Sequence, residues 1–135
     1  MRFVLLVAIV LSTLFAVMSP IMTGGWTEQD ATHPDIVSLG QKAVTKYNQQ
    51  SNDLHYHGFV KVLSAKSQVV AGTNYELEVL MGETGTLKNQ VKHEDLTAEH
   101  TKVKDDGKKK IVTVNIWSKP WEDFEEYTIK GVKQA

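Results

Sequence analysis

The chain has 135 residues with ordinary hydrophobic (41%) and charged (23%) fractions, which suits one globular domain better than two. Its formal net charge of −1 argues against a nucleic-acid partner, because such a partner requires a basic face. Cysteine is absent, so thiol catalysis, disulfides and cysteine-ligated metals are excluded. The stability of the domain must therefore come from its hydrophobic core.

Residues 1–19 have the pattern of a secretory signal peptide. Arg2 provides the positive start, and the stretch that follows it is apolar. This stretch is short for a membrane span and no charged stop follows it, so a transmembrane anchor is the weaker interpretation. Cleavage after Ala16 and cleavage after Ser19 both fit. We take residues 20–135 as the domain and expect a secreted, extracellular protein without membrane contact after signal removal.

Two consecutive glycines, Gly24 and Gly25, follow the signal segment. Because neither carries a Cβ atom, the pair forms a flexible joint between a short N-terminal arm and the body of the domain. Taken alone, the same feature also fits a frayed terminus. The glycines by themselves therefore do not define a site.

An amphipathic helix of about four turns is predicted from Thr32 to Gln50. Thr32 is the expected N-cap, Pro34 suits the opening turn, and Asp35 favours the positive end of the helix dipole. Apolar or small residues recur at helical spacing and indicate the buried face: Ile36, Leu39, Gly40, Ala43, Val44 and Tyr47. The small residues on this face let a sheet approach the helix closely.

Four strands are predicted after the helix, at residues 56–63, 74–81, 111–117 and 126–132. In the second of these, apolar and mostly polar residues alternate, so one face is buried and the other is wet. Residues 82–110 show little periodicity and are expected to form a long surface excursion. With a short strand before the helix, this order predicts an α+β fold in which one helix covers an antiparallel sheet.

The first hairpin tip is predicted at Gln68, Val69, Val70, Ala71 and Gly72. Only Gly72 is a typical turn residue, whereas the valines and the alanine leave apolar surface in water at a corner. Such a surface favours a contact site. The alternative is that Val69 and Val70 extend the strand and the turn lies elsewhere.

The second hairpin tip is predicted at residues 118–123 and contains Pro120 and Trp121. Proline is expected in a turn, but tryptophan is not. The indole is either folded back onto the body or offered to a partner, for which tryptophan is a favoured anchor. Sequential hairpins place the two tips at the same end of the sheet, within reach of the N-terminal arm.

In this order and spacing, the glycine pair, the Gln-Val-Val-Ala-Gly pentapeptide and the Pro-Trp pair resemble the motifs of a secreted cystatin. The resemblance covers essentially the whole mature chain. It implies a five-stranded antiparallel sheet wrapped around one long α-helix, and reversible, tight-binding inhibition of papain-like cysteine proteases of the cathepsin L, B and S types, with no cofactor. The implied protease-binding wedge has three parts: Met22, Thr23 and Gly24 in the arm, Gln68 to Gly72 in the first hairpin, and Pro120 and Trp121 in the second.

This chain departs from the family pattern at three points. Secreted cystatins generally carry two disulfides, and this chain has no cysteine. The residue before Gly24 is usually apolar, whereas here it is Thr23. The position after the glycine pair is often proline and here is Trp26. The second departure bears on the affinity of the arm and on protease preference.

The segment Ser51–Asn52–Asp53 resembles a helix-to-strand loop of some secreted cystatins, whose asparagine binds legumain, an asparagine-specific protease. The resemblance implies a second site at Asn52, at the opposite end of the molecule from the wedge. The same segment is also an ordinary way to leave a helix, because asparagine tolerates the left-handed conformation.

Other classes of function have weaker support in the sequence. His55 and His57 share a strand face, but a zinc site needs further ligands and an orienting second shell, so we expect solvent-facing histidines and no metal. The chain has no phosphate-binding loop or nucleophile signature, so we expect no catalytic residues. The stronger alternative is a non-inhibitory binding module on the same fold. We expect a monomer, with a domain-swapped dimer as the alternative, since the two apolar valines strain the first loop.

Overall fold

The structure is a computed structural model, and it describes residues 25–135. The predicted signal peptide at residues 1–19 lies outside the described residues, as do the three arm residues of the implied wedge, Met22, Thr23 and Gly24. Their roles stay predictions. Within residues 25–135, no helix is both long and apolar enough to cross a membrane.

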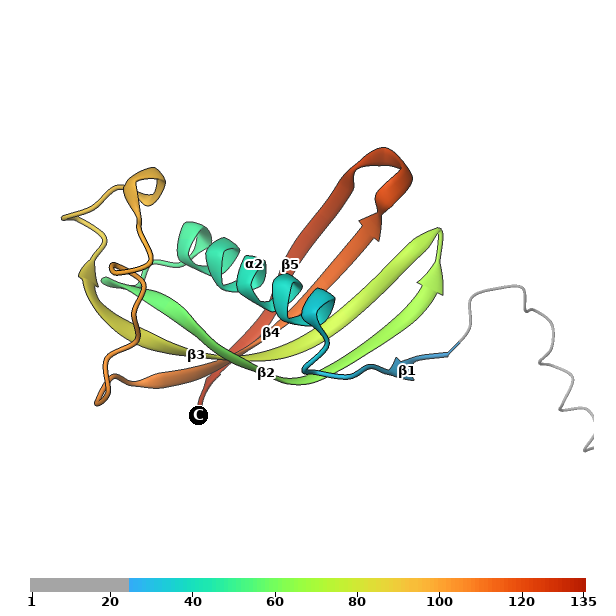
Figure 1. The fold of residues 1–135 in the computed structure, drawn as a ribbon, viewed down its shortest axis with the longest axis horizontal. Coiled ribbons are helices and arrows are strands. Elements are labelled where there is room, and N and C mark those ends of the chain that lie inside the picture. Colours follow the sequence, from blue (N-terminus) through green and yellow to red (C-terminus); the bar gives the residue numbers. More distant parts are fainter. Residues whose placement is uncertain (1–24) are drawn as a thin grey trace, which may run out of the picture.

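The described residues form one α-helix and one five-stranded sheet (Figure 1). The elements in chain order are β1 (Thr27–Glu28), α2 (Pro34–Gln50), β2 (His55–Val70), β3 (Gly72–Leu87), η1 (His93–Asp95), β4 (Lys109–Lys119), η2 (Pro120–Glu122) and β5 (Phe124–Gln134), where η marks a short 3₁₀ turn.

The sheet is antiparallel throughout, and its strand order is β1-β2-β3-β4-β5. Each strand therefore pairs with its neighbour in the sequence, as expected when hairpins make most of the connections. Figure 1 shows the sheet curving around α2, which lies across its concave face. The predicted α+β fold, a five-stranded antiparallel sheet wrapped around one long helix, is confirmed.

The core lies between α2 and the concave face of the sheet. All six residues predicted for the buried face of the helix are buried. The sheet contributes alternate residues from its central strands, and these are fully buried: Leu77, Val79, Met81, Val112, Val114 and Ile116. The close approach predicted at Gly40 is confirmed, because a Cβ atom there would lie 2.7 Å from Cγ2 of Val62.

The helix begins one residue later than predicted. His33 is the N-cap, and its Nδ1 accepts a hydrogen bond from the backbone N–H of Asp35 at 3.1 Å. Thr32 instead donates from its backbone and its hydroxyl to Oδ1 of Asp30, at 2.9 and 2.7 Å. The reason is Pro34: a proline has no N–H to give to a cap and fits best at the first helical position.

The strands are longer than the sequence pattern predicts. β3 continues through residues 82–87, which were expected to belong to the surface excursion. Thr84 is fully buried there, and its hydroxyl donates to the carbonyl of Tyr56 at 2.7 Å. Because this hydrogen bond satisfies the polar side chain, a strand without apolar alternation is stable at this position.

Candidate functional site

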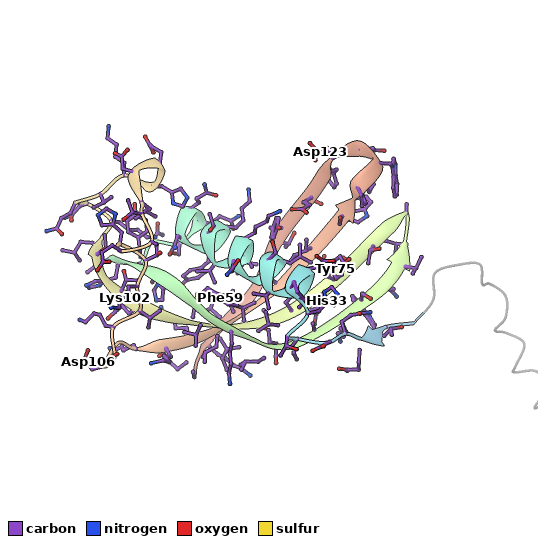
Figure 2. The ribbon with its side chains drawn as sticks, in the orientation of Figure 1. His33, Phe59, Tyr75, Lys102, Asp106 and Asp123 are labelled. Atoms are coloured by element: carbon purple, nitrogen blue, oxygen red, sulfur yellow. The ribbon has the colours of Figure 1, made fainter. Side chains whose placement is uncertain are left out.

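Both predicted tips lie at one end of the molecule, as Figure 1 shows for the β2–β3 and β4–β5 hairpins. Figure 2 places Asp123 at the outer tip of the β4–β5 hairpin and Asp106 near the far end of the molecule. Val69 and Trp121, on different hairpins, are 68% and 66% exposed. We call this end the tip edge and define it by Val69, Val70, Ala71, Gly72, Pro120 and Trp121.

The first hairpin turns more tightly than a five-residue loop. β2 runs through Gln68, Val69 and Val70, and β3 starts at Gly72, so only Ala71 lies between the strands. Val69 and Val70 therefore extend the strand, which was the alternative left open by the sequence. The side chain of Val69 nevertheless remains exposed, because the strand projects at the end of the sheet.

Gly72 is required at this turn for two reasons. Its φ is +92°, a conformation that residues with side chains rarely adopt. A Cβ atom there would also lie 2.3 Å from the carbonyl oxygen of Ser118 on β4. The turn of the first hairpin is thus pressed against the strand that leads into the second.

The second hairpin closes with the 3₁₀ turn η2. The N–H of Asp123 donates to the carbonyl of Pro120 at 3.0 Å, and Asp123 has a left-handed backbone with φ of 53°. Trp121 is not folded back onto the body. Its indole Nε1 donates to Oε2 of the adjacent Glu122 at 3.3 Å, and the ring stays largely exposed.

Trp117 on β4 joins the two hairpins, and the sequence pattern did not single it out. Its indole Nε1 donates to the carbonyl of Ala71 at 2.8 Å. Its ring meets Phe124 edge-on at 5.5 Å between centroids, and Nζ of Lys119 lies 4.5 Å from its centroid. The only local signal was a second tryptophan shortly before the Pro-Trp pair.

The chain enters the sheet beside the first hairpin. In β1, Thr27 and Glu28 pair with Ser67 and Lys66 of β2. Nζ of Lys66 lies 5.0 Å from the ring centroid of Trp26. The described chain therefore begins beside the end of β2 that leads to the tip edge and runs antiparallel to β2, away from that edge.

Asn52 lies at the opposite end, in the α2–β2 connection, so the 16-residue strand β2 separates it from the tip edge (Figure 1). Asn52 is exposed, and side-chain hydrogen bonds fix both of its neighbours in the chain. Nζ of Lys88 donates to the carbonyl and hydroxyl oxygens of Ser51 at 2.8 and 2.9 Å. The carboxylate of Asp53 accepts hydrogen bonds from the hydroxyl of Tyr47 and from Nζ of Lys110.

The expectation of solvent-facing histidines is wrong for His57, whose side chain is only 2% exposed. Its ring packs edge-on against Tyr47, and its main chain exchanges two hydrogen bonds with the side chain of Asn48. His57 is buried because the C-terminal part of α2 packs against the beginning of β2 through Tyr47 and Asn48. Among the described residues, no group of three or more metal-binding side chains is gathered.

The surroundings of the α2–β2 connection shift the pKa values of His57 and Asp53. Burial is the main cause that lowers the pKa of His57, since the charged ring is disfavoured away from water. For Asp53, partial burial acts against ionisation, but the hydrogen bonds from Tyr47 and Lys110 and the positive charge of Lys110 outweigh it. The pKa of Asp53 is therefore lowered.

The chain resembles known proteins over nearly its whole described length. A family model described as a cystatin domain matches residues 24–133. Cystatin cpi-1 of Caenorhabditis elegans is 37% identical over 137 residues, which is 98% of this chain and 96% of the relative. Onchocystatin of Onchocerca volvulus is 34% identical over 116 residues, or 86% of this chain and 70% of the relative. The crystal structure of Al-CPI is 46% identical in sequence to this chain and superimposes on it with a TM-score of 0.72. The match covers 83% of this chain and 100% of the Al-CPI chain. With this fold, these motifs and these matches, the chain belongs to the cystatin family of protease inhibitors.

Proposed function

We propose that this protein is a reversible, tight-binding inhibitor of papain-like cysteine proteases of the cathepsin L, B and S types. The observation that carries the proposal is the exposure of Val69 and Trp121 on two hairpins at one end of the sheet. Exposed apolar residues on two adjacent corners suit a partner with a narrow apolar cleft. The arm residues Met22, Thr23 and Gly24 form the third part of the proposed wedge.

Inhibition by this wedge is occlusion rather than chemistry. The two tips enter the active-site cleft, release water from apolar surface and exclude substrate, but they do not present a peptide bond to the catalytic cysteine. Because the hairpins are already formed, docking orders few side chains and loses little conformational entropy. A dissociation constant of about 1 nM is consistent with an interface of standard size.

Titration of papain with the secreted chain tests this function. Stoichiometric loss of activity that returns on dilution is the expected result. Val69→Asp should weaken inhibition at least roughly 100-fold, because a charge would be buried in an apolar cleft. Val132→Asp is the matched control. This valine is 41% exposed and lies near the C-terminal end of β5, away from the tip edge.

Failure of the wild-type chain to inhibit papain and a cathepsin L-like enzyme would favour the alternative, a non-inhibitory binding module on the cystatin fold. An intermediate case, in which both aspartate variants are equally impaired, would show that the exposed valine of the first hairpin has no special part in binding.

Secretion is part of the proposal. The apolar N-terminal segment supports removal of a signal peptide after Ala16 or after Ser19, and either cleavage leaves the arm attached to the domain. Intact-mass measurement of the secreted product tests both points. A mass that corresponds to a chain starting at Gly24 would mean that Met22 and Thr23 are absent from the wedge. Inhibition would then depend on the two hairpins.

A second site for legumain is proposed at Asn52. The hydrogen bonds that hold Ser51 and Asp53 support it, because they leave the exposed Asn52 presented between two fixed neighbours. Asn52→Ala should abolish inhibition of legumain and leave inhibition of papain unchanged. Asn89→Ala is the control, as this exposed asparagine follows Lys88, whose N–H donates to the carbonyl of Leu54. Legumain inhibition that survives Asn52→Ala would remove the site.

A further inference from the structure

We propose that Trp117 is a positioning residue that ties the first hairpin tip to the second, so that the two tips meet a protease as one unit. The inference rests on the proposed function, because it concerns the same tip edge. It goes beyond the proposed function because it assigns a role to a residue outside the family motifs. Trp117 acts through Ala71 rather than through contact with the protease.

The hydrogen bond from Trp117 reaches the one residue that lies between β2 and β3. Ala71 belongs to neither strand, so its carbonyl has no place in the regular ladder of the β2–β3 hairpin. The indole Nε1 donates to this carbonyl at 2.8 Å, across 46 residues of sequence. One side chain of β4 therefore fixes the apex of the neighbouring hairpin.

Trp117 is itself held on the side of the second hairpin. Lys119 places Nζ 4.5 Å from the Trp117 ring centroid and 4.7 Å from that of Phe124, within the range of a cation–π contact. The same Nζ lies 3.3 Å from Oε1 of Glu122. Because Oε2 of Glu122 accepts from the indole of Trp121, a continuous series of contacts joins Ala71 to Trp121.

Packing at the backbone supports the same coupling. Thr73 of β3 is in register with Ser118 of β4, directly beside the turn. A Cβ atom added at Gly72 would lie 2.9 Å from Cγ of Lys119 and 2.3 Å from the carbonyl oxygen of Ser118. The first turn therefore packs directly against β4, and the indole hydrogen bond to Ala71 adds to this contact.

The functional consequence is preorganisation. A hairpin apex that moves freely must be ordered when it binds, and this cost reduces affinity. When the apex is fixed in advance, the lifetime of the complex increases, since most differences among variants of one interface appear in the dissociation rate. Loss of the indole hydrogen bond should therefore accelerate dissociation while association changes little.

Trp117→Phe tests the inference because it retains an aromatic ring beside Lys119 and Phe124 but removes the N–H donor. We expect dissociation from papain about three- to tenfold faster, the effect of one typical hydrogen bond. Tyr127→Phe is the matched control. It removes a hydroxyl that donates to Glu125 on its own strand at 2.9 Å and leaves the first hairpin untouched, so its dissociation rate should equal that of the wild type.

Two further measurements separate positioning from other roles. In the free protein, the backbone order parameters of Ala71 and Gly72 should fall in Trp117→Phe and not in Tyr127→Phe. In a double-mutant cycle, Trp117→Phe and Val69→Ala should be non-additive, because both act through the first hairpin. Additive effects with unchanged order parameters would indicate direct contact between Trp117 and the protease, and would overturn the inference.

Failure of the inference can be distinguished from failure of the proposed function. A wild-type chain that inhibits papain, together with a Trp117→Phe variant of equal dissociation rate, contradicts the positioning role alone. A wild-type chain that does not inhibit papain contradicts the proposed function. In that case the order parameters still decide whether Trp117 fixes the first hairpin: unchanged values at Ala71 and Gly72 would overturn it.

Discussion

Trp121 shows how a local backbone conformation can keep a large apolar side chain in water. Pro120 fixes φ at the start of the 3₁₀ turn, and Asp123 ends the turn in the left-handed conformation. The turn is too short to bring the indole back to the core. Among the described residues, the indole N–H donates its hydrogen bond to the adjacent Glu122. An exposed tryptophan held in this way is suited to act as an anchor in an interface.

We expect Trp121→Ala to weaken papain inhibition by roughly 30-fold, corresponding to about 2 kcal/mol for an interface hot spot. The loss should appear mainly as faster dissociation, measured by stopped-flow or surface plasmon resonance. Trp121→Phe, which keeps most of the aromatic area, should lie between the alanine variant and the wild type. An unchanged dissociation rate in Trp121→Ala would count against its role as an anchor.

Gly72 is the residue whose substitution should most directly disturb the first turn. Gly72→Ala places a methyl group against the carbonyl of Ser118 and requires a φ of +92° from alanine. We expect the free energy of unfolding to fall by about 1–3 kcal/mol, measured by urea denaturation. Gly131→Ala is the control, since a Cβ atom there meets nothing within 4 Å. Equal destabilisation of the two variants would contradict this account.

At the scale of the elements, the connection between α2 and β2 brings Asp53, His57 and Lys110 close together. His57 lies beneath it, with Nδ1 3.7 Å from Oδ2 of Asp53. Burial lowers the pKa of His57 most strongly; Asp53 and Glu83 act in the opposite direction, and Lys110 and Lys88 reinforce the lowering. The folded protein therefore resists protonation of a histidine that the unfolded chain protonates readily.

This difference predicts a loss of stability in acid. Above about pH 6.5, His57 is neutral in both states and its contribution is fully present. As the pH falls from about 6.5 toward the lower folded pKa, the unfolded chain binds a proton first, and the free energy of unfolding decreases by at most about 1.4 kcal/mol per pH unit. Urea denaturation at several pH values between about 7.5 and 5 measures this slope.

His57→Gln should reduce the slope, because it removes the titrating ring and leaves the main-chain hydrogen bonds to Asn48 in place. Asn89→Ala, at an exposed residue that does not titrate, is the control and should retain the slope. If the wild type and His57→Gln have the same pH dependence, another group is responsible for it.

Asp53 contributes to stability in a lower pH range than His57. Because its folded pKa is lowered, it stabilises the fold above the ordinary aspartate pKa, and this stability is lost as the pH falls through the folded pKa.

At the scale of the whole molecule, the sheet and helix hold together without any disulfide. The strands of the first hairpin are each 16 residues long and are joined by Ala71 alone. If that turn opened, β2 and β3 could form one continuous strand and exchange with a second copy of the chain, because the same contacts are available between copies. Such exchange would conserve the core but remove the first tip.

We therefore expect the chain to be a monomer, and any dimer formed by mild heating to be inactive against papain. Size-exclusion chromatography with light scattering identifies the species, and papain titration of each fraction measures its activity. Gly72→Ala should increase the dimer fraction, because opening the turn relieves its strained φ. A dimer that inhibits papain as well as the monomer would show that both tips survive association.

Local periodicity in the sequence was sufficient to predict the helix, its buried face and the order of the strands. The helix and its buried face depend on residues a few positions apart, such as Leu39 and Ala43, and the strand order follows because hairpins join strands that are neighbours in the chain. The unusual composition of the first tip and the Pro-Trp pair likewise indicate Val69 and Trp121 as candidate contact residues, and both are exposed in the structure.

Only the tertiary structure decided the contacts between residues far apart in the chain. Trp117 meets Ala71 across 46 positions, and Lys110 reaches Asp53 across 57. Neither pair has a local signature, because a hydrogen bond depends on how strands are placed side by side and not on the spacing within one strand. The prediction that His57 faces solvent was wrong for the same reason: whether a face of a strand is covered depends on where the helix crosses the sheet.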